Sequence, residues 1–345
     1  MASRRRGPGW RDEAAAALLL RFLPGLSLRG RVLLMGELRP EVPEAMKGLG
    51  LEVHGWCRRG VAGFPATSWP PAGSYDAVFL RLPRSREALA MALHAAAGVL
   101  AEKGRVFVYG AKDEGISSAP GVMEELFAGV GTLGVGGRCR ILQGEAGSTG
   151  KGLKTTLDDW RDVWNPELDG LPERWVSYPG VFAHGRVDPG TRLLLDVMPP
   201  LSPGARVLDY GCGSGILGGA ALAREPGLDL HLLDVDAVAL EAARKNVPGA
   251  THILGDGLAG VASGAFDAIL SNPPFHRGKD EDPEMLRTFV REAARVLTPK
   301  GLLAMVTQRR ISLEEVFESC FDEVALLAGN ATFAVWLGRR PRGSA

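Results

Sequence analysis

The stretch Val207-Leu-Asp-Tyr-Gly-Cys-Gly-Ser-Gly215 decides the fold of the half of the chain in which it lies. An aliphatic run of strand character enters a turn that carries Gly211, Gly213 and Gly215, and a helical pattern follows from about Ile216. Glycine tolerates positive φ angles and lets the backbone approach a ligand closely. Because the first backbone amides of a helix can then face that ligand, the stretch predicts a strand–loop–helix unit that binds a small molecule.

Acidic residues stand at the ends of this predicted strand and of the next two. Asp209 lies just before the glycines, Asp234 ends the run His231-Leu-Leu-Asp234, and Asp256 follows a third run. A carboxylate at the end of the second strand can accept both hydroxyls of a ribose. Asp256 can receive the exocyclic amine of an adenine. In this order, at consecutive strand ends, the three acids predict a site for an adenosyl group.

The two halves of the chain follow one plan, and the order of the matching segments is kept. Helical patterns of ten or more residues lie between the matching runs, which predicts parallel strands joined by crossover helices. We therefore expect an α/β protein with two tandem doubly wound Rossmann-like domains, over residues 1–150 and 151–345. The matching segments are 31–36 with 206–211, 75–80 with 266–271, and 98–107 with 295–304.

The first half lacks the features that would hold a ligand. At the place of the glycine loop it has Gly36 alone, followed by the bulky Leu38 and Arg39. The counterpart of the second strand, Val53-His-Gly-Trp56, offers no acid at its end. We expect a degenerate domain that keeps the fold without a cofactor.

A second motif, Ser271-Asn-Pro-Pro-Phe275, follows the predicted strand 266–270 at the edge of the sheet where open α/β folds bind ligands. Its two prolines supply no N–H donors, so local carbonyl oxygens are left to accept hydrogen bonds. The Asn272 side-chain carbonyl and the Pro273 backbone carbonyl could hold the two hydrogens of an amino group, with Pro274 keeping the turn rigid. Phe275 could stack on the ring that bears the amine. The motif has no cysteine nucleophile, so the expected target is an amine nitrogen.

From about Lys154 to Trp336, the chain resembles the class I S-adenosyl-L-methionine-dependent methyltransferase domain, and above all the RsmC/RlmG group of ribosomal RNA guanine-N2 methyltransferases. That group also has a degenerate N-terminal copy before an active C-terminal one. The residues that carry the resemblance are Gly180-Val-Phe, Asp188-Pro-Gly-Thr191, Asp209-Tyr-Gly-Cys-Gly-Ser-Gly215, Asp234 and Asn272-Pro-Pro-Phe-His276.

The resemblance implies a function and a set of roles. S-adenosyl-L-methionine would be the cofactor, with Asp188 and Thr191 in a loop over it. Residues 272–275 would hold the guanine, with Asn272 bordering the cofactor as well. The product would be guanine methylated at N2 in ribosomal RNA, and the 16S RNA of the small subunit is the expected substrate.

Several alternatives stay open. The substrate could be a guanine of the large subunit. Glutamine-N5 and adenine-N6 methyltransferases use a similar Asn/Asp-Pro-Pro-aromatic signature, although with Tyr more often than the Phe275 found here. A non-catalytic RNA-binding assembly factor could keep the cofactor for structure alone. His276 is either a proton acceptor or a hydrogen-bonding loop residue. The connection from Lys154 to Pro179, with its extra tryptophans, departs from the group's pattern.

Charge is unevenly divided between the halves. Residues 1–150 carry 19 basic and 14 acidic side chains (19 − 14 = +5), and residues 151–345 carry 21 and 26 (21 − 26 = −5). The first half is therefore expected to recognise RNA, with Arg81, Arg84 and Arg86 meeting phosphates. The competing expectation is that it only covers an apolar face of the catalytic half.

The composition indicates in which cellular environment the protein works. The four cysteines are widely spaced without a CxxC pair, which argues against a zinc site and a disulfide framework. No charge-free apolar run reaches the roughly 18 residues of a membrane span. We expect a cytoplasmic enzyme without a metal or membrane association, whose partner is ribosomal RNA or a ribosomal subunit. The sequence does not indicate an oligomeric state.

Overall fold

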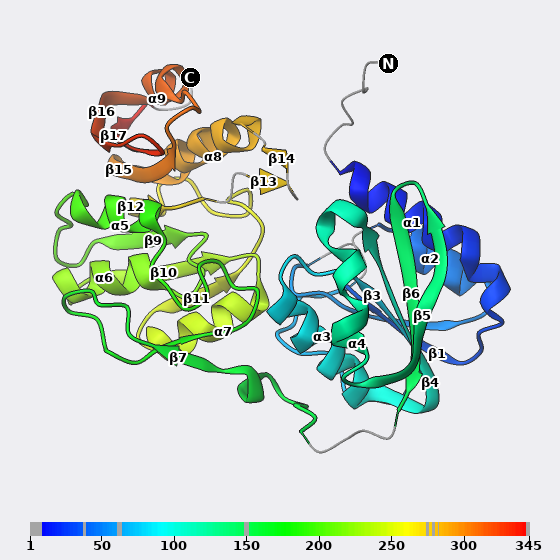
Figure 1. Ribbon diagram of the computed structural model, residues 1–345. Coiled ribbons are helices and arrows are strands. Elements are labelled where there is room, and N and C mark those ends of the chain that lie inside the picture. The colour runs from blue at the N-terminus through cyan, green and yellow to red at the C-terminus, as the bar shows by residue number, and fades with distance from the viewer. Residues whose placement is uncertain are drawn as a thin grey trace. The chain divides into compact units, whose positions relative to one another are not determined.

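A computed structural model describes residues 9–36, 39–60, 64–147, 152–273, 276–277, 280–281 and 283–342 (Figure 1). The chain divides into two compact units, Met1–Arg161 and Asp162–Ala345. The first unit extends past residue 150, the expected boundary, because the following segment packs on it. The backbone N–H of Lys154 donates to His94 Nδ1 at 3.1 Å. The rings of His94 and Trp160 pack edge to face, with their centroids 5.1 Å apart.

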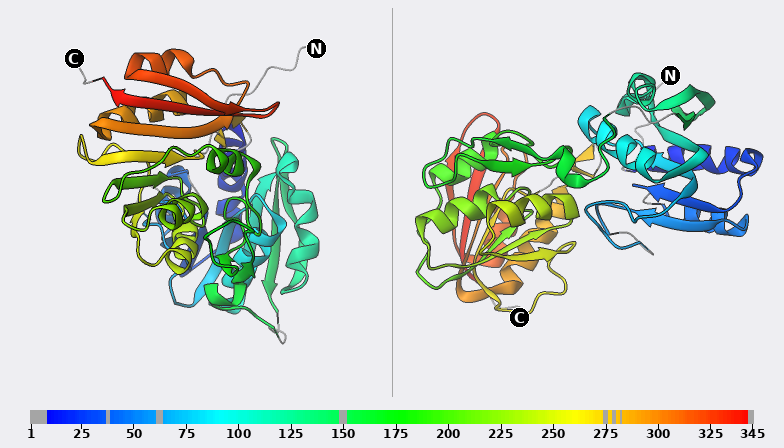
Figure 2. Two further views of the ribbon diagram at one scale, coloured as in Figure 1. Left: turned by 90° about the vertical axis from the view of Figure 1, so that its left-hand side faces the viewer. Right: turned by 90° about the horizontal axis from the view of Figure 1, so that it is seen from below.

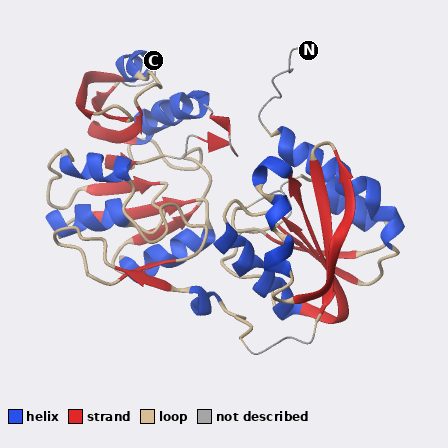
Figure 3. Ribbon diagram, viewed as in Figure 1, coloured by secondary structure: helices blue, strands red, loops and turns tan. Residues whose placement is uncertain are grey.

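The first unit is built on a six-stranded sheet with helices on both faces (Figure 3). Its first four strands run parallel, and the last two form an antiparallel extension. Side chains alternate between two apolar cores: Val78 and Leu80 enter one, and Ala77 and Phe79 the other. The strand order is β2 (Glu52–Trp56), β1 (Arg31–Met35), β3 (Tyr75–Arg81), β4 (Leu100–Ala111), β6 (Cys139–Ala146), β5 (Phe127–Gly136); the helices are α1 (Trp10–Phe22), α2 (Glu41–Gly48), α3 (Arg86–Val99) and α4 (Pro120–Met123).

The second unit repeats this plan with seven strands. Five strands run parallel, and the antiparallel pair β16 and β17 extends the sheet beside β15 (Figure 2). The order is β11 (Thr251–Leu254), β10 (Asp229–Asp234), β9 (Arg206–Tyr210), β12 (Phe266–Ser271), β15 (Leu297–Gln308), β17 (Phe333–Pro341), β16 (Phe321–Gly329). The helices are α5 (Pro189–Asp196), α6 (Ile216–Arg224), α7 (Ala237–Asn246), α8 (Pro283–Val296) and α9 (Glu314–Cys320). Two short ribbons pair β7 (Asp162–Trp164) with β8 (Trp175–Ser177), and β13 (His276–Arg277) with β14 (Asp280–Glu281).

The predicted α/β fold with two tandem Rossmann-like domains is confirmed, and the repeat extends to single contacts. In each unit the arginine that opens the first strand donates its backbone N–H to an aspartate near the start of the neighbouring strand on one side (β3 or β12), and its Nε to an acid at the start of the neighbouring strand on the other side (β2 or β10). The pairs are Arg31–Asp76 (2.8 Å) and Arg31–Glu52 (3.1 Å) in the first unit, and Arg206–Asp267 (3.0 Å) and Arg206–Asp229 (3.0 Å) in the second.

This shared register shows which residue of the first unit stands where Asn272 stands in the second. Val32 pairs with Ala77, and Val207 pairs with Ala268. Four residues beyond each alanine come Arg81 and Asn272 respectively. Among the described residues, the first unit has no counterpart of β11, the outermost strand of the second sheet.

Arg81 does not meet solvent as the sequence reading expected. Its side chain is only 7% exposed. Nε donates to Asp12 at 3.0 Å, and one guanidinium nitrogen donates to both oxygens of Glu114 at 2.8 and 2.9 Å. Because these two acids already neutralise it, the expectation that Arg81 contacts RNA phosphates is wrong.

The predicted helix before β15 is present as α8. It buries Leu286, Phe289, Val290 and Ala293, while the proposed cap Asp282 lies outside the described residues. No helix in the described part of the chain is long and apolar enough to span a membrane.

Candidate active site

The glycine loop lies at the carboxyl edge of the second sheet, between β9 and α6. Gly211, Gly213 and Gly215 all have positive φ, at 72°, 55° and 88°. The amides of Gly211 and Cys212 donate to the carbonyl of Leu233 in the neighbouring strand, at 2.8 and 3.0 Å. The glycines are therefore needed for the path of the loop, because L side chains rarely tolerate these angles.

Asp234, at the end of β10, holds the glycine loop in place. One carboxylate oxygen accepts the backbone N–H of Gly213 at 2.8 Å, and the other accepts that of Asp236 at 2.9 Å. Hydrogen bonds to an ionised acceptor are among the stronger ones in proteins. The acid that the sequence assigned to a ribose is thus also part of the loop's support.

The connection that the sequence left undecided supports the loop from the other side. Trp175 in β8 donates Nε1 to Ser214 Oγ at 3.1 Å. Asn246, at the end of α7, donates Nδ2 to the carbonyls of Ser214 (2.9 Å) and Val176 (2.8 Å) and accepts the Val176 N–H at 2.7 Å. A Cβ on Gly219 would lie 2.8 Å from the Trp175 ring, so α6 packs directly on this tryptophan.

Asp209 is a buried carboxyl group beneath the glycine loop. It is 1% exposed, and one oxygen accepts the backbone N–H of Gly218 in α6 at 2.8 Å. Burial raises its pKa to about 7; the Gly218 hydrogen bond opposes this rise, and the charge of Asp234 adds to it. Near neutral pH the group is therefore poised between its charged and neutral forms, and a cation nearby would favour the charged form.

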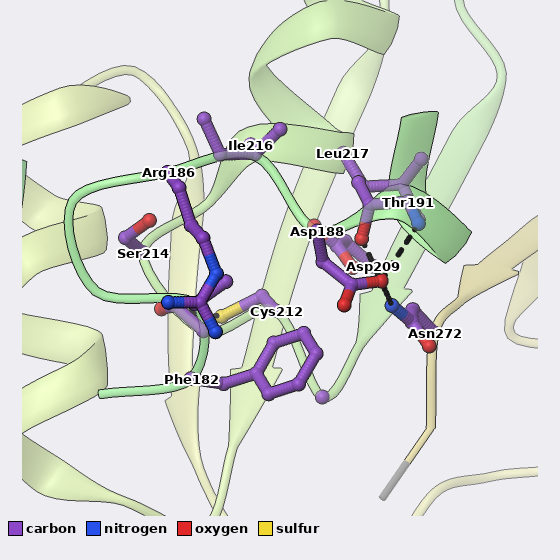
Figure 4. Close-up of a pocket in the computed structure, with 13 residues that line it drawn as sticks. Phe182, Arg186, Asp188, Thr191, Asp209, Cys212, Ser214, Ile216, Leu217 and Asn272 are labelled. Atoms are coloured by element: carbon purple, nitrogen blue, oxygen red, sulfur yellow. Dashed lines mark hydrogen bonds between the residues drawn. The ribbon is translucent and has the colours of Figure 1, made fainter. Parts of the chain in front are cut away.

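A cavity of about 420 Å³, part of it open to solvent, lies beside the loop (Figure 4). Six of the residues that the sequence singled out line it: Asp188, Thr191, Asp209, Gly211, Gly213 and Asn272. Three others do not line it: Gly215 packs near α7, Asp234 holds the loop, and Asp256 is exposed beyond β11.

Sequence reasoning missed seven lining residues as members of the site: Phe182, Ala183, Arg186, Cys212, Ser214, Ile216 and Leu217. Four of them belong to the glycine loop and the start of α6, so the loop itself was a signal for them. Phe182 stands out because it is 59% exposed, and it lies in the Gly180-Val-Phe stretch. No sequence pattern marked Arg186.

Asn272 is fixed in one orientation by the start of α5. Asp188 caps this helix, and one of its carboxylate oxygens accepts the N–H groups of Gly190 (2.8 Å) and Thr191 (3.1 Å). The same oxygen accepts Asn272 Nδ2 at 2.9 Å, and that nitrogen also donates to Thr191 Oγ1 at 2.9 Å. Both hydrogens of the amide are thereby used. Its carbonyl oxygen points away from Asp188 and Thr191 (Figure 4).

The remainder of the Asn-Pro-Pro-Phe motif is described only in part. Pro273 is buried. Pro274 and Phe275, and the side chain of His276, lie outside the described residues. Among the described residues no cluster of three or more His, Cys, Asp or Glu side chains could hold a metal ion.

Comparison with known proteins identifies the family of this chain. The methyltransferase small domain family matches residues 174–337, and its N-terminal domain matches residues 18–162. The ribosomal RNA small subunit methyltransferase C of Hahella chejuensis is 31% identical over 90% of this chain and 94% of its own length. The ribosomal RNA large subunit methyltransferase G of Alcanivorax borkumensis is 34% identical over 80% and 71%.

One solved structure covers both units. It is the T. thermophilus 16S rRNA N2 G1207 methyltransferase (RsmC) in complex with AdoMet and guanosine, with a TM-score of 0.80, 25% identity, and coverage of 96% of this chain and 93% of that one. Together with the glycine loop and the Asn272 motif, these matches define an S-adenosylmethionine-dependent methyltransferase. The chain belongs to the methyltransferase small domain family and, within it, to the RsmC/RlmG group.

The residues of the site fit S-adenosyl-L-methionine. A Cβ on Gly213 would meet no atom within 4 Å, so the loop backbone is open on that side. The buried Asp209 carboxyl lines the cavity and gains its charge most easily next to a cation, and the cofactor carries a sulfonium.

Proposed function

We propose that this enzyme transfers the methyl group of S-adenosyl-L-methionine to the exocyclic N2 of a guanine in ribosomal RNA, and that its substrate is the 16S RNA of the small subunit. The names of the Hahella relative and of the T. thermophilus structure support this substrate. One observation carries the proposal: the amide of Asn272 spends both hydrogens on Asp188 and Thr191, and its carbonyl is left as an acceptor at the cavity.

An acceptor held in this way suits an amino group. The Asn272 carbonyl and the backbone carbonyl of Pro273 accept the two N–H groups of guanine N2, which turns the nitrogen lone pair toward the methyl donor. Positive charge grows on that nitrogen as the bond forms, and two preorganised carbonyl oxygens stabilise it. A neighbouring hydroxyl or water could not hold the amine so rigidly, because its own orientation would have to be fixed first.

The cofactor supplies a methyl group that is already activated. The residues of the site therefore have to align the guanine amine with this methyl group and hold it there. From the sequence motif we assign Phe275 to stacking on the base and Pro274 to the rigidity of the turn; both lie outside the described residues. The methylated nitrogen is acidic enough to lose its proton to water, so His276 is not required as a base.

We assign the cofactor contacts as follows. The glycine loop lets its backbone approach the cofactor closely, on the side that is open at Gly213, and Asp209 compensates the positive charge of the cofactor. Asp188 and Thr191 border it together with Asn272. Asp234 accepts the ribose hydroxyls with the lone pairs that its contact to Gly213 leaves available, and Asp256 receives the adenine amine.

The first unit is proposed to contribute RNA recognition rather than a second cofactor site. A large-subunit guanine is the second candidate substrate, and the name of the Alcanivorax relative favours it. With either substrate the enzyme works where ribosomes are made, and we place it in the cytoplasm.

A direct test is methyl transfer in vitro with isotope-labelled S-adenosyl-L-methionine. The substrates are 16S RNA and small subunits that lack guanine-N2 methylation, with 23S RNA and large subunits in parallel. We expect the label in N2-methylguanosine of the small-subunit RNA. Label in N6-methyladenosine, or in no RNA at all, would contradict the proposal, whereas label in large-subunit RNA would select the second candidate.

A further inference from the structure

The carboxyl edges of the two sheets carry opposite charges. In the second unit the strand ends at this edge present Asp209, Asp234 and, two residues further on, Asp236. In the first unit β2 is followed by Arg58 and Arg59, and β3 ends in Arg81 and is followed by Arg84. The strands concerned are parallel neighbours of β1 in one unit and of β9 in the other, so the edges correspond.

Two acids near this edge of the first unit are ion-paired with Arg81. Asp12 and Glu114 both form ion pairs with its guanidinium at 2.8 Å, and Glu114 also accepts the backbone N–H of Ala111 at 2.8 Å. This ion cluster replaces the open position that Asn272 borders in the second unit. Both of these acids are therefore already paired with Arg81.

Arg59 and Arg84 remain as cations at the same edge. Both residues are exposed, and neither forms an ion pair within the described part of the chain. Protein surrounds enough of the Arg84 guanidinium that burial, and then the charge of Arg59, lowers its pKa, while Asp12 and Glu114 act in the opposite sense. The two arginines follow the strands that flank β1 on either side, so their like charges stand at one edge of the sheet, and an anion between them would reduce their repulsion.

The start of α3 adds to the positive potential. Arg86 is the first residue of this helix and is exposed, and Ser85 caps it by accepting the N–H of Ala88 at 3.1 Å. The amino end of a helix carries partial positive charge, and Glu87 in the same turn offsets only part of the charge of this end and of Arg86.

We propose that Arg59 and Arg84 form a phosphate-binding site for the backbone of the substrate RNA, at the edge of the first sheet that corresponds to the cofactor edge of the second. The inference rests on the proposed function, because it takes RNA as the substrate. The proposed site consists of these two side chains and does not include Arg81. At this edge the second unit binds the cationic cofactor, whereas the first unit binds the anionic phosphate of the RNA.

The test compares three double variants of the full chain. Arg59→Gln/Arg84→Gln removes two charges from the proposed site. Arg29→Gln/Lys47→Gln removes two charges from exposed positions at the opposite edge, before β1 and in the last turn of α2. Arg59→Lys/Arg84→Lys keeps the charge. Affinity for an unmodified 16S RNA transcript is measured by fluorescence anisotropy at several salt concentrations. Urea unfolding reports on the folding of the first unit, and calorimetry reports on cofactor affinity.

We expect Arg59→Gln/Arg84→Gln to bind the transcript at least about tenfold more weakly, since one hydrogen bond to a charged group is worth that much. The slope of log affinity against log salt should become shallower by about 1.4, or about 0.7 for each phosphate released. The lysine variant should keep most of the slope, the opposite-edge variant should keep both slope and affinity, and all should bind cofactor normally.

Equal losses of RNA affinity in both glutamine variants, or no loss of affinity in either, would overturn the inference. The proposed function is judged separately from the unmodified enzyme. If that enzyme methylates 16S RNA while Arg59→Gln/Arg84→Gln binds it normally, only the phosphate site is wrong. If it methylates no RNA, the function is wrong.

Discussion

Asp209→Asn tests the buried carboxyl group beneath the glycine loop. The substitution keeps an oxygen that can accept the Gly218 N–H, now at 2.8 Å, but removes the charge. Burial raises the pKa of Asp209 from 3.8 to about 7. At a pH between these values the unfolded chain has released this proton and the folded chain has not. The folded state thus binds more protons, and its stability falls as pH rises.

The size of the effect follows from the two pKa values. A difference of 7 − 3.8, about three pH units, corresponds to about 4 kcal/mol as an upper estimate. The loss should develop between about pH 4 and pH 7 and stay constant above pH 7. Relative to the wild type, Asp209→Asn should therefore gain stability across this window. Urea unfolding at pH 4.5, 6 and 7.5 measures the difference in the free energy of unfolding between the two proteins.

Cofactor binding should respond in the opposite direction. A cationic cofactor favours the charged carboxylate, so its affinity for the wild type should rise as pH increases from 6 to 8, with release of a proton at the lower end. In Asp209→Asn this contribution should vanish, and the variant should bind more weakly at pH 8. Calorimetry in two buffers of different ionisation enthalpy counts the proton. A difference in stability that does not change with pH, together with an unchanged proton count, would refute the reasoning.

Three other substitutions probe the site. Asn272→Ala should slow methyl transfer at least about a hundredfold, as expected for the loss of one positioned acceptor, with little change in cofactor affinity; equal loss of both would mean that Asn272 only supports the fold. Asp234→Ala should weaken cofactor binding about tenfold or more, because a charged acceptor for Gly213 and for the ribose is lost, and an unchanged dissociation constant in calorimetry would rule out the assignment. Trp175→Phe removes the hydrogen bond to Ser214 and should lower the free energy of unfolding by about 1 kcal/mol; urea unfolding curves that coincide with the wild type would show that this contact does not support the loop.

The parallel part of each sheet could be predicted because its signals are local. The aliphatic runs at 31–36 and 206–211 became β1 and β9, each followed by its turn and helix. The antiparallel pairs at the end of each sheet were not located from sequence. Strand β5 has a glycine at four of its ten positions, which hides the alternation of a strand, and its partner is chosen by tertiary packing.

The site was predictable where its residues are neighbours in sequence, as in the glycine loop and the Asn272 motif. Arg81 shows the limit. A basic residue at a strand end predicts an exposed charge, but its partners Asp12 and Glu114 lie 69 and 33 residues away along the chain. Phe182 and Arg186 were missed for the same reason, because only the folded chain brings their turn beside the glycine loop.

The most direct test of the central claim is mass spectrometry of ribosomal RNA nucleosides from a strain that lacks the gene, complemented with either the wild type or Asn272→Ala. We predict that N2-methylguanosine is lost from one site of 16S RNA, is restored by the wild type and is not restored by the variant. An unchanged set of methylated guanines, or loss of a different methylated nucleoside, would contradict the account.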